Sequence, residues 1–291
     1  MPSNSKPIET MTKKTYDLVF GLGAVCSCSE TLRKAGLQHL SFPGDWTSPL
    51  GDDLPAPNLV LRVDRLCDGF DGFFNPEDFV FKRRYEGTQK DIYNNTRTHY
   101  VFNHDFPAGS DFSAELPKVV AKYVKRRNRL LSLVRNSRKV LVFRLDLPNG
   151  KMPTSLDDCR YAHSRLQGTF PGVDFDFVLM QPDPSRTLQT RLVEQPESWL
   201  TRIAFDYNDP KSENDALYPD LQLTSAAIAE IASVRDYRTA EEKRQHALNR
   251  RRKRYARVGA KNGFDYQRIR LANWLKGIFG ALRPRAAADR R

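Results

Sequence analysis

Cys26 occupies the position in this sequence that best suits covalent chemistry. It follows an apolar run at 16–20, which predicts a short buried strand, and it precedes a segment of helical spacing that begins at Ser27. A thiol at the start of a helix is more acidic, because the helix N-terminus carries partial positive charge. The amides of that first turn, at Ser27, could hold an oxyanion. Gly23 lets the chain turn tightly just before the cysteine, and Gly23 and Ser27 are candidate substrate-binding residues. Cys26 is therefore the candidate nucleophile.

The other three cysteines bear on this assignment. Cys28 lies two residues further on and could compete with Cys26, pair with it or bind a metal ion. A single Cys-x-Cys without a second cluster is a weak metal signal, so we expect neither a metal site nor a cofactor. Cys67 and Cys159 are expected to be packing residues. Four cysteines in a chain of 291 residues do not make a disulfide framework.

A catalytic thiol needs a base, which is usually a histidine held by a third polar group. Of the five histidines, His104 comes just after an extended segment at 98–102, with Asp105 beside it. Adjacent residues of an extended chain point to opposite sides, so these two side chains are not expected to meet. Asp146, at the end of a predicted strand, and Asp45, in a Phe-Pro-Gly-Asp-Trp turn, are the alternatives for the third group.

The elements that must position these residues alternate between helix and strand. Helices are expected at 27–35, 59–67, 113–136 and 155–166, and extended segments or strands at 16–20, 79–83, 98–102, 139–146, 174–180, 188–193 and 199–205. This order predicts an α/β fold, with a layered, mostly parallel sheet flanked by helices. Chemistry in such folds gathers at the carboxyl ends of the strands. Cys26, His104 and Asp146 each follow an apparent strand.

The composition is that of a globular protein, with 40% hydrophobic, 28% charged and 11% aromatic residues. The 17 Phe and 11 Tyr exclude a chain that is disordered throughout. No stretch approaches the ~18 apolar residues that a membrane-spanning helix needs. The N-terminal segment has no continuous apolar run of the kind found in secretory signals. We therefore expect a cytoplasmic protein.

Positive charge is concentrated at the C-terminal end. The net charge of the chain is +12, and residues 234–291 hold 18 Lys and Arg against 5 Asp and Glu, so that the rest of the chain is close to neutral. We expect a flexible N-terminus at 1–14, a catalytic domain at 15–232 and a basic helical extension at 233–291.

Two segments of this basic tail predict helices. Residues 235–257 are helix-prone and have little apolar surface, whereas 266–282 place large apolar residues near one face and basic residues towards the other. The second pattern is typical of a helix that lies on an anionic membrane surface, here the inner face of the membrane. The alternative is a helix that packs on the body of the protein. The basic run at 250–254 could contact nucleic acid, but no recognised motif accompanies it, so this partner is not expected.

Four elements together resemble a bacterial family of papain-like cysteine peptidases, a domain of unknown function. They are Gly-Leu-Gly-x-x-Cys-x-x-Ser-x-x-Leu-Arg at 21–33, Ser-Phe-Pro-Gly-Asp-Trp at 41–46, His-Asp-Phe at 104–106, and the Arg-rich segment 123–130 that leads into 140–144. The resemblance covers about 16–205. Gly21, Ser29 and Gly44 stand where the family has Ser, Ala and Phe.

The resemblance assigns the nucleophile to Cys26 rather than Cys28 and the base to His104, and it leaves the third group open. It implies a thiol-dependent hydrolase or acyltransferase of the papain-like type, whose substrate is a peptide, an acyl compound or a glycan-linked compound. Papain-like proteins have an α+β fold, which is the alternative to the mostly parallel sheet.

Members of this family often look associated with surface-polysaccharide synthesis. The alternative function is therefore a non-catalytic binding or accessory protein of surface-polysaccharide assembly, tethered to the membrane surface by the basic tail. Trp46, in the second family element, is a further candidate for substrate binding. Arg127 and Arg144 could bind an anionic substrate such as a sugar phosphate, and the alternative is a solvated helix face plus one strand-end arginine.

Overall fold

The computed structural model describes residues 8, 11–51, 53–149, 153–187, 190–208 and 219–257, together with 267, 269 and 271. The chain divides into two compact units, Met1–Tyr237 and Arg238–Arg291. Within the described ranges, no helix is both long and apolar enough to cross a membrane.

A five-stranded sheet forms the centre of the first unit, in the order β2-β7-β8-β10-β9. Its strands are β2 (Leu18–Gly21), β7 (Lys139–Leu145), β8 (Asp174–Pro182), β10 (Leu200–Phe205) and β9 (Leu192–Glu197). The first four are parallel, and β9 runs antiparallel at the edge. The runs in β7 and β8 are apolar almost without interruption, because both faces of the sheet are covered.

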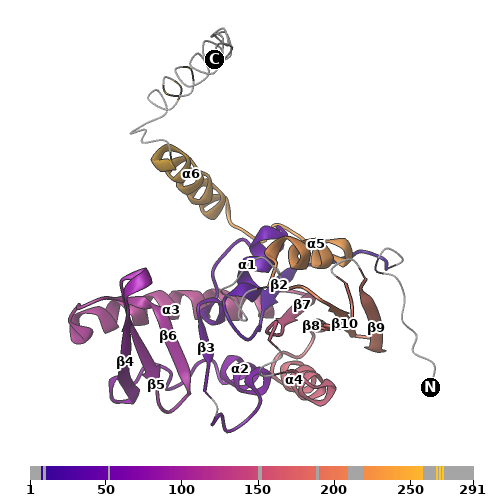
Figure 1. Ribbon diagram of the computed structural model, residues 1–291, viewed down its shortest axis with the longest axis horizontal. Helices are drawn as coiled ribbons and strands as arrows, with labels where there is room; N and C mark the ends of the chain where they lie inside the picture. The colour runs from indigo at the N-terminus through magenta and orange to yellow at the C-terminus, as the bar shows by residue number, and fades with distance from the viewer. Residues whose placement is uncertain are drawn as a thin grey trace, which may run out of the picture. The chain divides into compact units, whose positions relative to one another are not determined.

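Helices pack on the two faces of this central sheet (Figure 1). They are α1 (Ser27–Lys34) and α5 (Leu221–Ile231) on one face, and α2 (Asn58–Cys67) and α4 (Leu156–Thr169) on the other. Alternate residues of β7 separate two cores. Leu141 and Phe143 pack with α1 and α5, whereas Val140 and Val142 pack with α2 and α4.

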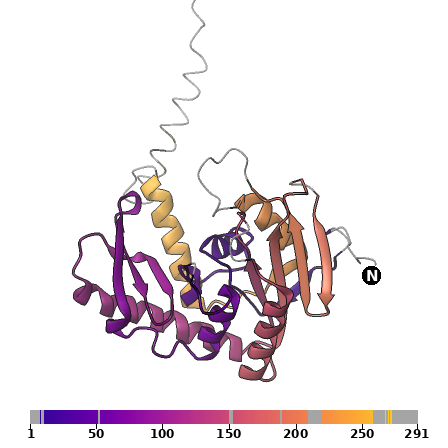
Figure 2. The same cartoon turned by 60° about the horizontal axis from the view of Figure 1, so that its bottom comes forward.

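A second sheet of four strands is antiparallel throughout, in the order β3-β6-β5-β4. Its strands are β3 (Thr47–Pro49), β6 (Tyr100–Pro107), β5 (Lys90–Asn95) and β4 (Phe79–Tyr85). The long helix α3 (Phe112–Arg135) runs along this sheet (Figure 2). Aromatic rings fill the space between them, with Phe102 and Tyr123 5.6 Å apart and Tyr93 stacked on Phe112 at 4.7 Å between centroids.

The expectation of a mostly parallel sheet is therefore correct for the central sheet alone, and the whole is a mixed α/β fold. The extended segments expected at 79–83 and 98–102 correspond to β4 and β6, whereas β5 and β3 carry too weak a signal to be predicted. In β5, Ile92 and Tyr93 are flanked by polar residues, and β3 is only three residues long. Such strands form through pairing and aromatic packing more than through local propensity.

Both ends of the first unit are tied down by backbone pairing. Strand β1 (Lys14–Tyr16) pairs in parallel with β11 (Ala232–Val234). The hydroxyl of Tyr237 accepts a hydrogen bond from the backbone of His39 at 3.0 Å. Residues 233–237, which the sequence analysis placed in the tail, thus pack with the first unit. Of the N-terminal segment expected to be flexible, Ile8 is buried; residues 1–7 and 9–10 lie outside the described residues.

The second unit contains α6 (Ala240–Arg257), which is the first helix predicted in the tail. A capping box begins it: the backbone amide of Thr239 donates to Glu242, and the amide of Glu242 donates to the Thr239 hydroxyl at 3.1 Å. Its described side chains are mostly exposed. The amphipathic helix predicted at 266–282 lies outside the described residues, except for positions 267, 269 and 271.

Candidate active site

Cys26 and His104 line one cleft, with a volume of about 270 Å³. The cleft lies between the start of α1 and the antiparallel sheet. The other described residues that line it are Val25, Trp46, Thr47, Ser48, Leu50, Arg83, Tyr85, Thr88, Ile92 and Asn103. Two residues that are 78 positions apart in the sequence thus line the same cleft.

Cys26 is the N-cap residue of α1, between the end of β2 and the first helical turn. Its carbonyl accepts the amide of Glu30 at 3.1 Å and the hydroxyl of Ser29 at 3.0 Å. The thiol is partly buried. The positive end of the α1 dipole lies at this position and favours negative charge on a group bound there.

The neighbouring Cys28 is in a different environment. Its side chain is 2% exposed, and its Sγ donates to the carbonyl oxygen of Phe143 at 3.4 Å. Burial raises the pKa of Cys28 to about 12. Burial likewise raises the pKa of Cys159 to about 12 and raises that of Cys67. Of the four cysteines, Cys26 is the one that lines the cleft.

Gly23 and Ser27, both predicted to bind substrate, support the start of α1 and do not line the cleft. A Cβ atom at Gly23 would lie 2.6 Å from the Sγ of Cys28, which is too close for any real contact. Gly23 therefore lets β2 and α1 approach each other. The side chain of Ser27 is 2% exposed.

His104 lies inside β6, although the sequence placed it after the end of a strand. The register is irregular here, because Tyr93 pairs with Phe102 while Asp91 pairs with Phe106. Four positions of β6 therefore span the distance that two positions of β5 cover. Bulges of this kind redirect side chains and are frequent beside functional sites. The irregularity brings His104 to the cleft.

The imidazole of His104 packs against Trp46. The ring centroids are 5.6 Å apart, and the planes meet edge to face at 81°. Partial burial lowers the pKa of His104 below its ordinary value of 6.5, and the carboxylates of Asp105 and Glu30 partly oppose this effect. His104 is thus neutral at pH 7, which is the form that accepts a proton.

Asp105 points away from the cleft towards α3. Its carboxylate accepts the hydroxyl of Tyr123 at 2.9 Å and forms an ion pair with Lys122. As expected for adjacent residues of a strand, Asp105 makes its contacts on the side opposite to His104.

Asp45, the second candidate for the third group, holds the loop that carries Trp46. Its buried carboxylate accepts Arg33 at 2.6 Å, Gln38 at 2.7 Å and the backbone amide of Phe42 at 2.9 Å. Burial raises the pKa of Asp45, and the charge of Arg33 opposes that shift. The guanidinium of Arg33 also lies 5.7 Å from the centre of the Trp46 ring.

Asp146, the third candidate, belongs to a buried network. It accepts Arg144 at 2.9 Å, the backbone amide of Thr154 at 2.8 Å and Gln181 at 3.0 Å. Arg144 is 1% exposed and also donates to the amide oxygen of Asn58 at 2.7 Å. Arg144 is therefore inaccessible to a substrate.

The network nevertheless reaches the cleft through one further residue. The amide nitrogen of Asn58 donates to the hydroxyl of Ser48, which lines the cleft, at 3.2 Å.

Arg127 lies on α3 and donates to Asn128 at 3.0 Å, and it does not line the cleft.

The cleft residues that local sequence patterns do not predict come mainly from the antiparallel sheet. Arg83 and Tyr85 on β4 and Ile92 on β5 form one wall of the cleft, and Glu30 on α1 acts on His104. The pairing of Arg83 with Ile92 depends on a hairpin register that local patterns do not reveal. Within the described ranges, no three His, Cys, Asp or Glu side chains are grouped in a way that could hold a metal ion.

A family model with the description "Putative papain-like cysteine peptidase" matches residues 17–184. The chain belongs to this family. The region shared with these papain-like cysteine peptidases begins just before β2 and ends just after β8, so it contains Cys26, His104 and the whole antiparallel sheet. Membership in the papain-like cysteine peptidase family supports thiol hydrolysis in general. No curated protein and no solved structure matches the chain.

Proposed function

We propose that the protein is a thiol-dependent hydrolase or acyltransferase with Cys26 as the nucleophile and His104 as the base. One observation carries this proposal: the two side chains line the same cleft, whereas the other cysteines do not. Family membership supports the same class of chemistry.

The reaction begins when the imidazole of His104 takes the proton of the Cys26 thiol. The thiolate then attacks the carbonyl carbon of the acyl group, a carbon–sulfur bond forms, and negative charge moves to the carbonyl oxygen. The amides at the start of α1 and the dipole of this helix stabilise that negative charge.

The tetrahedral intermediate collapses when the bond to the leaving group breaks. The leaving amine or alcohol takes the proton from His104, and the acyl group stays on the sulfur of Cys26. Water or a second acceptor then gives its proton to His104 and attacks the acyl carbon. The thiol is regenerated when the carbon–sulfur bond breaks.

Trp46 acts as a positioning residue in this mechanism, because its ring packs edge to face with the His104 imidazole and restricts the rotation of that imidazole. None of the three candidate aspartates orients the His104 imidazole in this proposal. Each of them is engaged elsewhere, Asp105 with α3, Asp45 with Arg33 and Asp146 with Arg144.

Hydrolysis of p-nitrophenyl acetate tests the proposal with a simple activated ester. We expect the wild-type protein and Cys28→Ala to release nitrophenolate, and Cys26→Ala to release none above the rate in buffer. His104→Ala should lower the rate by ~10²-fold or more. Equal loss in the two cysteine variants, or full activity in Cys26→Ala, would contradict the assignment. Absence of nitrophenolate release by the wild type above the rate in buffer would favour the non-catalytic role in surface-polysaccharide assembly.

A further inference from the structure

We propose that the cleft recognises an acyl donor that carries a carboxylate, and that Arg83 binds this group. The inference rests on the proposed function, since it names the class of substrate that reaches Cys26. It assigns to Arg83 the anion-binding role that the sequence suggested for Arg127 and Arg144, neither of which lines the cleft.

The charge of the cleft points to an anionic ligand. Among the described residues that line it, none is acidic, and Arg83 carries the only permanent positive charge. Arg83 forms no ion pair with any part of the chain that the structure describes. The next residue, Arg84, is already engaged, because its Nε donates to Asp91 at 2.8 Å.

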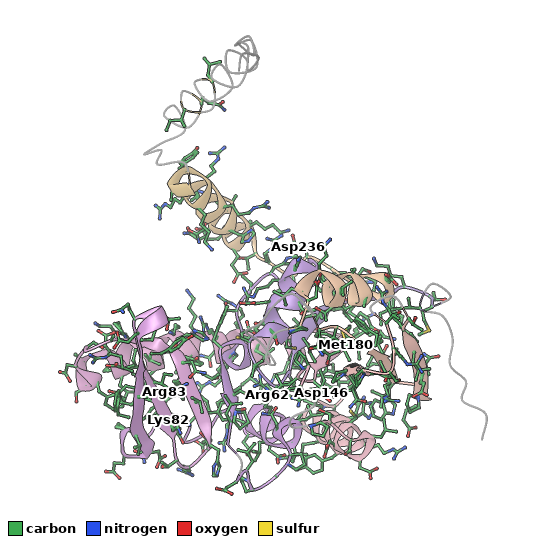
Figure 3. All side chains as sticks on the ribbon, in the orientation of Figure 1. Arg62, Lys82, Arg83, Asp146, Met180 and Asp236 are labelled. Carbon is green, nitrogen blue, oxygen red and sulfur yellow. The ribbon has the colours of Figure 1, made fainter. Side chains whose placement is uncertain are left out.

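The register of the hairpin turns Arg83 towards the cleft. Phe81 pairs with Tyr93, and their rings lie 5.7 Å apart on the side of the sheet that faces α3. The register then shifts, and Arg83 pairs with Ile92, which lines the cleft. Lys82 lies at the shift and does not line the cleft, although it is the immediate neighbour of Arg83 on β4 (Figure 3).

The rest of the wall defines the other part of the substrate. Trp46, Leu50, Tyr85 and Ile92 offer apolar surface around the cleft. A guanidinium group matches a carboxylate with two parallel hydrogen bonds, and one arginine balances one such charge. The expected substrate therefore combines an apolar or aromatic part with one carboxylate.

Two alkylating reagents of nearly equal size test the inference. Iodoacetate carries a carboxylate and iodoacetamide is its neutral counterpart, and in both the thiolate of Cys26 displaces iodide from the CH₂ group. The rate at Cys26 is read by peptide mass spectrometry for the wild type, Arg83→Gln and Lys82→Gln. The control, Lys82→Gln, removes the same charge from the adjacent residue.

We expect Arg83→Gln to lower the ratio of the iodoacetate rate to the iodoacetamide rate by roughly threefold or more, because only iodoacetate carries the charge that Arg83 attracts. Lys82→Gln should leave the ratio as in the wild type. An unchanged ratio in Arg83→Gln, or equal falls in both variants, would overturn the inference while leaving the proposed function intact. A Cys26 that is inert to iodoacetamide would instead overturn the proposed function.

Discussion

The indole ring of Trp46 meets the imidazole ring of His104 edge to face, with centroids 5.6 Å apart. Trp46 is in turn held by the guanidinium of Arg33, which lies 5.7 Å from its ring centre and pairs with the buried carboxylate of Asp45 at 2.6 Å. Asp45 thus acts on the cleft through two other side chains. This explains why an aspartate next to the site has no direct contact with the base.

Replacement of Trp46 by leucine should release the His104 ring. Edge-to-face aromatic pairs contribute about 0.5–1.5 kcal/mol, so we expect the alkylation rate of Cys26 at pH 7 to fall by roughly two- to tenfold. Trp46→Phe keeps an aromatic edge and should retain most of the rate. If Cys26 is alkylated as fast in Trp46→Leu as in the wild type, the Trp46 ring does not position His104.

Gly23→Ala should destabilise the protein, because the new Cβ would lie 2.6 Å from the Sγ of Cys28 and α1 would have to shift. Overpacking of this kind costs about 1–3 kcal/mol, which thermal unfolding measures. Gly168→Ala in α4 is the matched control, since a Cβ there meets nothing within 4 Å. It should be neutral or stabilise by up to about 1 kcal/mol. Equal stability of the two variants would contradict the close approach of β2 and α1.

Arg144→Ala should lower the free energy of unfolding by about 3–5 kcal/mol, because it leaves the buried carboxylate of Asp146 without its charged partner. Denaturant titration measures this loss. Arg165 provides a control, since its ion pairs with Asp64 and Asp68 are partly exposed and Arg165→Ala should cost ~1 kcal/mol or less. An Arg144→Ala protein with the same free energy of unfolding as the wild type would show that the buried Arg144–Asp146 network does not stabilise the fold.

The central sheet and the cysteine position could be predicted from the sequence because they rest on local signals. The largely apolar run at 139–145 predicts a strand that is covered on both faces. The strand pattern before Cys26 and the helical pattern after it place this residue at the start of a helix. The helix α6 at 240–257 follows from the helix-prone composition of 235–257 in the same way.

The remainder of the site depends on tertiary pairing that no local pattern encodes. His104 is brought to the cleft by a shift in the register between β5 and β6, and Arg83 by a shift between β4 and β5. Asp146 follows a strand as predicted, but the arginine two residues before it turns it into a core residue. Spacing from a strand end therefore predicts the position of Cys26 at the start of α1 and does not predict which acidic residues reach the cleft.

The basic tail should bring the protein to anionic membranes through the predicted amphipathic helix at 266–282. Co-sedimentation with liposomes that contain phosphatidylserine measures this binding for the full chain and for a chain that ends at Tyr237. We expect the full chain alone to pellet, and less of it at high salt, because each Lys or Arg near the surface contributes about 1 kcal/mol. Equal pelleting of both chains would dismiss the tail as an anchor.

The rate of iodoacetamide alkylation of each cysteine, followed against pH, tests the thiol–imidazole pair most directly. Because the pKa of His104 is lowered, its imidazole is neutral at pH 7 and can take the thiol proton. The imidazole becomes protonated, and loses this ability, only below pH 6.5. Cys26 should therefore react quickly well below pH ~8.5, where ordinary thiols ionise, and its profile should move towards that value in His104→Ala. Cys28 and Cys159, with pKa values of about 12, should stay unmodified in the folded protein. If Cys26 is inert until the protein unfolds, or if His104→Ala leaves its profile unchanged, the proposed catalytic pair is wrong.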